Sequence, residues 1–262
     1  MTTAATTMSQ TARQWGVMWG ARPRDWAVTE QNQTPIYQEV IDRIGVGPGD
    51  RVLDVGCGTG VFLHMCAKRG AAVTGIDASE GLLEIARERV PGADLCHGDM
   101  QFLPYADGSF DLVTGFTSFF FAEDMVAALR EAGRVSRPGA PIAIQVFGRP
   151  EHCDLELVKA AVMAFRPAEQ QEREYWRPGI VEDMVAAAGL TLDTAFDSTW
   201  PYVYPDEAAF ADAMLSAGGA SLAAGDREPA LRAALIDALA HRRQGDGSYR
   251  LTNEWHTVIA HA

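Results

Sequence analysis

The order of hydrophobic and polar positions predicts strands that alternate with helices through the middle of the chain. Short β-branched runs typical of buried strands alternate with segments whose apolar residues recur every three or four positions, as in helices. Ser79 and Asp124 are suited to cap two of these helices. Alternation at this spacing indicates a mostly parallel, doubly wound sheet. The expected strands are residues 51–55, 72–76, 93–97, 110–114 and 140–147, and the helices between them are 61–68, 79–90 and 124–136.

The flanking segments add further elements to this pattern. Helices are expected at 14–19, 35–44, 154–165, 179–188, 206–216 and 229–241, with strands at 191–198 and 249–260. The connection between the last two strands is long enough to indicate an inserted helical cap. We therefore expect an α/β, Rossmann-like fold with a seven-stranded, mostly parallel sheet, helices on both faces and a helical cap. The predicted parts are an N-terminal helical lid (1–48), a ligand-binding core (49–150) and a C-terminal part with the cap (151–262).

Composition and charge narrow the classes of partner. The chain has 35 acidic and 22 basic residues among 262, a formal net charge of −13. Such a surface repels a polyanion, so we expect a small-molecule substrate and no nucleic acid. A negative field also suits a cationic cofactor or amine. No apolar run approaches the roughly 18 residues that span a bilayer, so no membrane association is expected.

The cysteines and the N-terminus bear on location. Cys57, Cys66, Cys96 and Cys153 form no C-x-x-C pair, which favours reduced thiols over a disulfide framework or a zinc site, and no metal is expected. Residues 1–10 lack the basic start and hydrophobic stretch of a signal peptide. We expect a cytoplasmic protein, either a monomer or a homodimer.

A glycine-rich turn joins the first predicted strand to the first helix of the sheet. It follows Asp54 and has the spacing G-x-G-x-G at Gly56, Gly58 and Gly60. Glycines allow positive φ and let a ligand approach the backbone closely, and the carboxyl ends of strands are where open α/β sheets bind ligands. Val61 stands where the dinucleotide fingerprint requires a glycine or alanine, which disfavours a nicotinamide cofactor.

Acidic residues end the next two predicted strands. Asp77 lies about 20 residues after the first glycine, where a carboxylate can accept hydrogen bonds from both hydroxyls of a ribose. Asp99 can accept from an adenine amino group, and Met100 can offer its backbone amide. Phe116 ends the fourth strand beside the same crevice. The ordered set predicts a site for an adenosyl group.

Together these segments resemble the successive motifs of class I S-adenosylmethionine-dependent methyltransferases, specifically the small-molecule "methyltransferase type 11" group. The resemblance covers roughly residues 50–150. The segment Arg134-Val135-Ser136-Arg137-Pro138-Gly139-Ala140 is similar to the group's L-R/K-P-G-G motif, with Ser136 and Ala140 as departures that lie outside the cofactor pocket.

The resemblance assigns the cofactor S-adenosyl-L-methionine to particular residues. It implies that the methionyl side lies along Asp54, Gly56, Gly58 and Gly60, the ribose at Asp77, and the adenine at Asp99 and Met100, with Ala78 and Phe116 completing the site.

Substrate contacts are expected from aromatic residues outside the glycine turn. Trp15, Trp19 and Trp26 resemble the N-terminal lid of related enzymes that closes over the cofactor, although they could instead fix the lid helices to the body. Phe119 or Phe120, after the fourth strand, should also reach the substrate. For the later aromatics Trp176, Tyr202 and Tyr204, packing is favoured over contact.

A general base is needed only for an acceptor that is a weak acid. His152, after the fifth strand, is the best candidate, although a loop histidine without a role is the simpler interpretation. Glu123 is an alternative polar group, and His256 on the last strand is expected to be structural.

The preferred function is methyl transfer to the oxygen, nitrogen or carbon of a small, fairly apolar acceptor. Only Lys68 and Lys159 are lysines, which hints at a GC-rich bacterial genome and fits natural-product or small-metabolite tailoring. A cyclase or other non-methylating enzyme that keeps the cofactor, and a non-catalytic cofactor-binding module, are the alternatives. A nicotinamide oxidoreductase is least favoured.

Overall fold

A seven-stranded sheet runs through the molecule in the computed structural model, which describes residues 7–166 and 179–262. The strand order is β3-β2-β1-β4-β5-β7-β6. The first five strands are mutually parallel, while β7 runs antiparallel to both of its neighbours. The strands are β1 (Arg51–Val55), β2 (Ala72–Asp77), β3 (Asp94–His97), β4 (Leu112–Phe116), β5 (Pro141–Phe147), β6 (Thr191–Tyr204) and β7 (Tyr249–His261).

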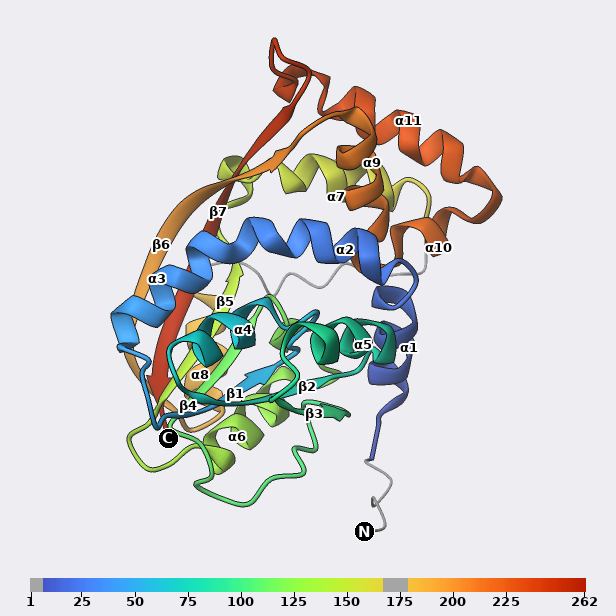
Figure 1. Ribbon diagram of the computed structural model, residues 1–262. Coiled ribbons are helices and arrows are strands. Elements are labelled where there is room, and N and C mark those ends of the chain that lie inside the picture. The colour runs from blue at the N-terminus through green and yellow to red at the C-terminus, as the bar shows by residue number, and fades with distance from the viewer. Residues whose placement is uncertain (1–6, 167–178) are drawn as a thin grey trace.

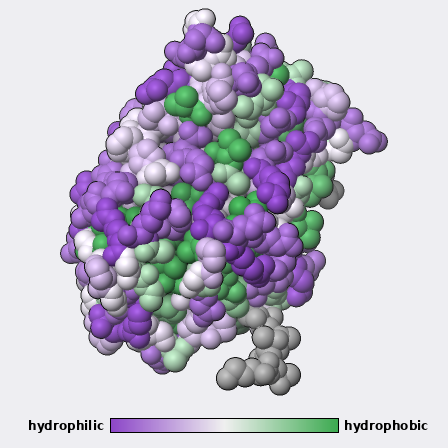
Figure 2. Space-filling model, in the orientation of Figure 1, coloured by the Kyte–Doolittle hydropathy of each residue, from purple (hydrophilic) through white to green (hydrophobic). Residues whose placement is uncertain are grey.

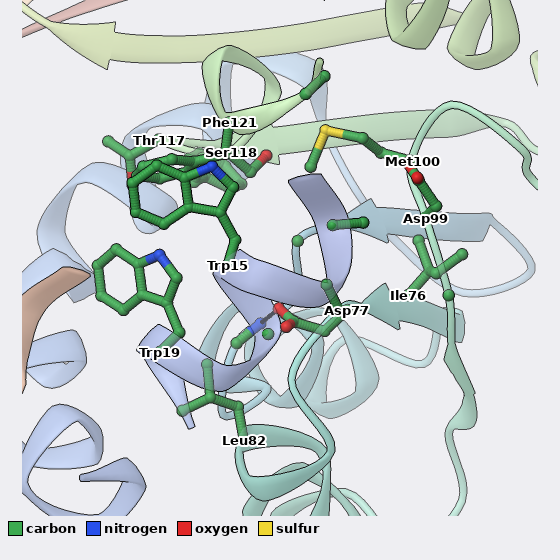
Figure 3. A pocket seen from close by; sticks show the side chains of 18 of the residues that line it. Trp15, Trp19, Ile76, Asp77, Leu82, Asp99, Met100, Thr117, Ser118 and Phe121 are labelled. Atoms are coloured by element: carbon green, nitrogen blue, oxygen red, sulfur yellow. Dashed lines mark hydrogen bonds between the residues drawn. The ribbon is translucent and has the colours of Figure 1, made fainter. Parts of the chain in front are cut away.

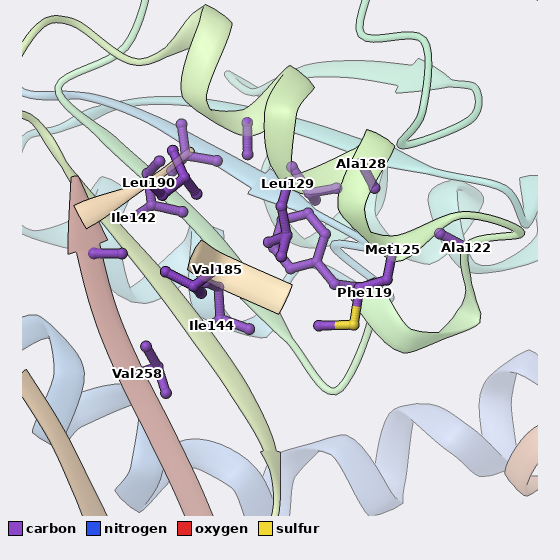
Figure 4. Close-up of a cluster of buried hydrophobic side chains, with 14 of the residues drawn as sticks. Phe119, Ala122, Met125, Ala128, Leu129, Ile142, Ile144, Val185, Leu190 and Val258 are labelled. Carbon is purple, nitrogen blue, oxygen red and sulfur yellow. The ribbon is translucent and has the colours of Figure 1, made fainter. Parts of the chain in front are cut away.

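Helices cover both faces of this sheet (Figure 1). One face packs on α3 (Thr34–Ile44) and α4 (Val61–Lys68), together with α5 (Glu80–Arg89). The other packs on α6 (Met125–Val135) and α8 (Ile180–Ala187), whose buried side chains form the cluster in Figure 4. The mostly parallel, doubly wound sheet predicted from the pattern is therefore confirmed.

The helical cap lies above one end of the sheet in Figure 1. Its own hydrophobic cluster joins α7 (Leu155–Met163), α9 (Glu207–Ser216) and α11 (Glu228–Ala238) to the C-terminal part of β6 and the N-terminal half of β7. Trp255 and Tyr202 are fully buried in this cluster. Most of the cap helices lie between β6 and β7 in the chain, so the long connection between these two strands is an inserted helical cap, as predicted. The cap helices are α7 (Leu155–Met163), α9 (Glu207–Ser216), α10 (Ala220–Ala224) and α11 (Glu228–Ala238).

Two further helices precede α3 in the chain. In α1 (Gln10–Trp19) the Ser9 side chain accepts a hydrogen bond from Ala12 N, which caps the helix. The predicted helix at 14–19 thus begins four residues earlier. The second, α2 (Pro23–Glu30), was not predicted because its buried residues are polar, so no apolar stripe marks it. The proline at its first position is nevertheless a common start signal.

Some boundaries also differ from the prediction. Strand β4 begins at Leu112, and Phe110 makes only an isolated bridge to Ser136. Strand β6 continues through Pro201 to Tyr204, beyond the expected end at residue 198. A proline cannot donate to a strand ladder, but β6 is the edge of the sheet, where that loss is tolerated.

The face in Figure 2 is largely hydrophilic, broken by small hydrophobic groups. Within the described residues, no helix is both long and apolar enough to cross a membrane. The same part of the chain holds no group of three metal-ligating side chains.

Candidate functional site

The glycine turn leaves β1 at the carboxyl edge of the sheet. Gly56, Gly58 and Gly60 all have positive φ, at 79°, 54° and 76°. The backbone amides of Gly56 and Cys57 donate to the Ile76 carbonyl, which ties the turn to the end of β2. A Cβ on Gly56 would lie 2.4 Å from the Cβ of Ser118, so only glycine fits there.

Asp77 ends β2 and holds the same turn. Its Oδ2 accepts a hydrogen bond from Gly58 N at 2.9 Å, and its Oδ1 accepts from Ser79 N at 2.8 Å. Burial raises the pKa of this carboxyl, while the backbone hydrogen bonds oppose that shift. Each oxygen keeps acceptor capacity for a ligand.

Asp99 lies after β3 and is 2% exposed. Its carboxylate accepts from Gln101 N and, at 2.9 Å, from Ser9 N at the start of α1. The helix also approaches the sheet closely at Gly16, where a Cβ would lie 2.0 Å from the Ala78 carbonyl oxygen. The lid helix therefore contacts both the ribose-side and adenine-side segments of the predicted site.

These groups surround a first cavity of about 90 Å³, beneath α1 (Figure 3). Ile76, Leu82 and Met100 add apolar surface suited to a flat ring, beside two carboxylates. That chemistry fits an adenosyl group. Of the predicted cofactor residues, those that line this cavity are Gly56, Gly58, Asp77, Ala78, Asp99, Met100 and Phe116.

Asp54 and Gly60 do not line the first cavity. A Cβ on Gly60 would meet Ala86 at 3.2 Å, so this glycine serves close packing of the turn on α5. Asp54 is buried and accepts a hydrogen bond from Thr114 Oγ1 at 2.7 Å. Desolvation raises the pKa of Asp54 to about 8.

A second, larger cavity of about 480 Å³ lies between the N-terminal helices and the cap. Its walls are mostly apolar and include Phe147, Val158, Val162 and Trp255. The two cavities share part of their walls. The residues that line both are Trp15, Trp19, Trp26, Thr117 and Phe121.

All three predicted lid tryptophans therefore lie at the shared wall. Trp19 packs edge-on against Trp26 with ring centroids 4.6 Å apart, and Trp15 lies 4.5 Å from Phe121. In Figure 3 the rings of Trp15 and Trp19 project from α1 toward one side. Packing between the lid helices and exposure to a cavity thus coexist in the same side chains.

The two candidate phenylalanines separate. Phe119 is 1% exposed, packs in the core and lines neither cavity (Figure 4). Phe120 lines the second cavity. Tyr202, for which packing was favoured, lines that cavity as well, whereas Tyr204 is fully buried in the cap cluster. Trp176 lies outside the described residues.

The expected general base lies away from the cavities. His152 lines neither of them, and its Nδ1 is hydrogen bonded to Glu254 Oε2 at 2.7 Å. The carboxylate also binds Arg149, so His152 belongs to a polar cluster that joins the segment after β5 to the middle of β7. Glu123 lines neither cavity and accepts a long hydrogen bond from Thr11. His256 bonds to Asp197 and Glu182, as a structural residue would.

Two residues were not predicted from the sequence: Glu30, which contacts the glycine turn, and Thr117, which belongs to the shared wall. Glu30 at the end of α2 is 3% exposed and accepts hydrogen bonds from Thr59 N and Thr59 Oγ1 at 2.9 and 2.7 Å, so it joins the lid to the turn. Thr117 has a φ of 49°, which is strained for a β-branched residue. No pattern marked Glu30, but Thr117 follows the strand end that was already assigned to the crevice.

The central part of the chain is similar to known methyltransferases. Residues 53–144 match the family model described as "Methyltransferase domain". A demethylmenaquinone methyltransferase of Renibacterium salmoninarum is 39% identical over 111 residues, which are 42% of this chain and 47% of that protein. A malonyl-acyl-carrier-protein O-methyltransferase of Serratia marcescens is 37% identical over 111 residues, 41% and 44% of the two chains. The chain thus spans just under half the length of these curated relatives.

Solved structures resemble the whole fold. The crystal structure of the [4+2]-cyclase SpnF has a TM-score of 0.68 at 20% identity and covers 98% of both chains. That of a putative methyltransferase from Bacillus halodurans has a TM-score of 0.60 at 19% identity and covers 86% of this chain and 97% of that one. At these identities the likeness establishes the fold alone.

Proposed function

We propose that this chain, whose residues 53–144 match the methyltransferase domain, is a class I S-adenosylmethionine-dependent methyltransferase that methylates a small, fairly apolar acceptor at oxygen, nitrogen or carbon. The observation that carries the proposal is the wall shared by the two cavities. An adenosyl-binding site and a large apolar cavity that meet at common residues can bring donor and acceptor together. The tailoring of a bacterial natural product or small metabolite fits this pairing.

In this proposal each part of the chain has one task. Residues 1–48 form the lid, 49–150 the cofactor-binding core and 151–262 the part that carries the cap. S-adenosylmethionine, when bound, supplies a methyl group already activated on a sulfonium. Asp77 and Ala78 bind the ribose, Asp99 and Met100 the adenine, and Gly56 and Gly58 the methionyl side. A carboxylate-rich first cavity also favours a cationic ligand.

The shared wall places the acceptor and excludes water. Its residues are aromatic except for Thr117, and none of them titrates near neutral pH. Proton removal by a side chain at this wall is therefore not part of the mechanism. Catalysis rests on holding the nucleophile in line in a dry pocket. Such a site suits an acceptor atom that is nucleophilic or acidic by itself.

A non-methylating reaction on the same scaffold is the second candidate. The likeness to the [4+2]-cyclase SpnF over nearly the whole chain favours it, as far as fold goes. A cyclase would use the apolar cavity to fold its substrate and would leave the cofactor unchanged. The fate of the cofactor therefore separates the two functions.

The first test measures turnover of the cofactor. The chain is incubated with S-adenosylmethionine and a panel of apolar amines, phenols and carboxylic acids, and S-adenosylhomocysteine is quantified. We expect it to accumulate with at least one acceptor class. Conversion of a substrate without S-adenosylhomocysteine would instead favour the cyclase.

A matched pair of variants tests the cofactor site by calorimetry. Asp77→Ala should weaken S-adenosylmethionine binding at least tenfold. It removes the carboxylate that would accept hydrogen bonds from the ligand, and with it the hydrogen bond that holds the backbone amide of Gly58. Asp94→Ala removes an exposed carboxylate on β3 and should leave the affinity unchanged. Wild-type affinity in Asp77→Ala would refute the ribose assignment.

A further inference from the structure

Among the residues that the structure describes, three charged side chains line the second cavity, and the other lining residues are apolar or neutral. The three charged residues are Glu156, Lys159 and Arg166. Glu156 and Lys159 form an ion pair on α7, with Lys159 Nζ 3.2 Å from Glu156 Oε2. The charges of Glu156 and Lys159 offset each other, so among the described lining residues the charge that is left over is the guanidinium of Arg166. The net charge of the whole chain is −13, whereas the described part of this cavity wall carries a net positive charge.

Arg166 follows the end of α7 and has unused donors. Its Nη2 donates to the Gly218 carbonyl at 2.9 Å, which fixes the side chain against the turn after α9. Its Nε is buried without a hydrogen-bond partner, and within the described residues no carboxylate forms an ion pair with this guanidinium. Burial also lowers the pKa of the arginine. Leaving a buried donor unpaired is unfavourable, so a ligand that accepts a hydrogen bond from it gains affinity.

Arg166 lies close to the wall shared with the first cavity. A Cβ built on Gly218 would lie 3.9 Å from Arg166 Nη2 and 4.0 Å from Trp19 Cζ2. The guanidinium and this tryptophan therefore flank the same point of the backbone. A ligand held at Arg166 would extend along the apolar wall formed by Val158, Val162 and their neighbours.

We propose that the acceptor carries a carboxylate that Arg166 binds, while its apolar body fills the second cavity; this rests on the proposed function. A planar guanidinium matches a carboxylate in a bidentate arrangement. One uncompensated positive charge suits a monoanion better than a phosphate dianion. The acidic surface of the chain would repel anions in general, so a single cation inside an apolar cavity confers selectivity for an apolar acid.

The experiment compares ligands that differ only in the head group. Decanoate, 1-decanol and decylammonium are titrated into the chain with S-adenosylhomocysteine present, and intrinsic fluorescence is followed because four tryptophans line the cavity. The wild type should bind decanoate at least tenfold more tightly than the alcohol, and the ammonium most weakly. Equal affinities for the acid and the alcohol would overturn the proposal.

Variants then assign the preference to one residue. Arg166→Gln should abolish the difference between acid and alcohol, and Arg166→Lys should keep part of it because the charge remains. Arg250→Gln, at an exposed position on β7, is the control and should behave as wild type. An acid preference that survives in Arg166→Gln would overturn the assignment. Should Arg166→Gln fail to fold, Arg166→Lys and the wild-type comparison of head groups still decide.

The outcome is independent of turnover. An acid preference that depends on Arg166, without S-adenosylhomocysteine from any acceptor, would refute the proposed methyl transfer and leave the subsite in place. Methylation of neutral acceptors with no preference for decanoate would refute the subsite alone.

Discussion

Binding of S-adenosylmethionine should release a proton, chiefly from Asp54. This carboxyl is 3% exposed and lies two residues before Gly56, the first glycine of the turn. Desolvation is the main cause of its raised pKa, and the negative charges of Glu30 and Asp77 add to it, although the hydrogen bond from Thr114 opposes the shift. In the protein without cofactor Asp54 is therefore mostly protonated at neutral pH, although it lies behind the glycine turn and does not itself line the first cavity.

The size of the effect follows from the pKa of about 8 for Asp54. At pH 7 such a group is about 90% protonated. An opposite charge nearby lowers a carboxyl pKa by about 1 to 3, so about 0.4 to 0.9 proton per chain should leave when the cation binds. S-adenosylhomocysteine lacks the sulfonium charge and should release much less.

Calorimetry measures this release directly. The binding enthalpy at pH 7 is compared in phosphate and Tris, whose ionisation enthalpies differ, and the slope gives the number of protons. Asp54→Asn removes the titrating group and should reduce the release, while the exposed Asp94→Asn should not. Equal enthalpies in the two buffers for the wild type, or an unchanged release in Asp54→Asn, would refute the reasoning.

Two further predictions concern the lid and the polar cluster around Glu254 in the middle of β7. Gly16→Ala should lower the affinity for S-adenosylhomocysteine at least tenfold, because the new Cβ would lie 2.0 Å from the Ala78 carbonyl oxygen and displace α1. The affinity is measured by calorimetry, and the control is Gly92→Ala, whose new Cβ has open space around it. The pKa of Glu254 is lowered to about 2, mainly by its hydrogen bonds with Arg149. A lowered pKa contributes stability that is present above the ordinary value of about 4.5 and is lost as pH falls toward 2. Thermal unfolding should therefore give Glu254→Gln a lower Tm than wild type at pH 6, with the gap closing in acid; a constant gap would contradict this.

The sequence predicted the fold well where apolar periodicity was strong. The strands and helices from β1 to β5 lie near their expected positions, and Ser79 and Asp124 cap α5 and α6 as expected. Helix α2 was not predicted because its buried residues are Thr29 and Glu30, so no apolar stripe marks the face that packs on the protein. Only tertiary contact with the glycine turn explains why a carboxylate is buried at that point.

The residues that line the first cavity were more predictable than those that line the second. Turn glycines and strand-end acids have fixed places along the chain, and seven of the nine predicted residues line the first cavity. The second cavity is assembled from the lid, the loop after β4 and the cap, which are distant in sequence. No local pattern could single out Arg166, and His152 was chosen for its loop without knowledge of its bond to Glu254.

A crystal structure of the chain with S-adenosylhomocysteine tests the central claim most directly, namely that the donor and acceptor sites meet at one wall. The account predicts the ribose on Asp77, the adenine between Asp99 and Met100, and the sulfur facing the second cavity beside Thr117. A nucleoside bound elsewhere, or a sulfur that faces away from the apolar cavity, would contradict it.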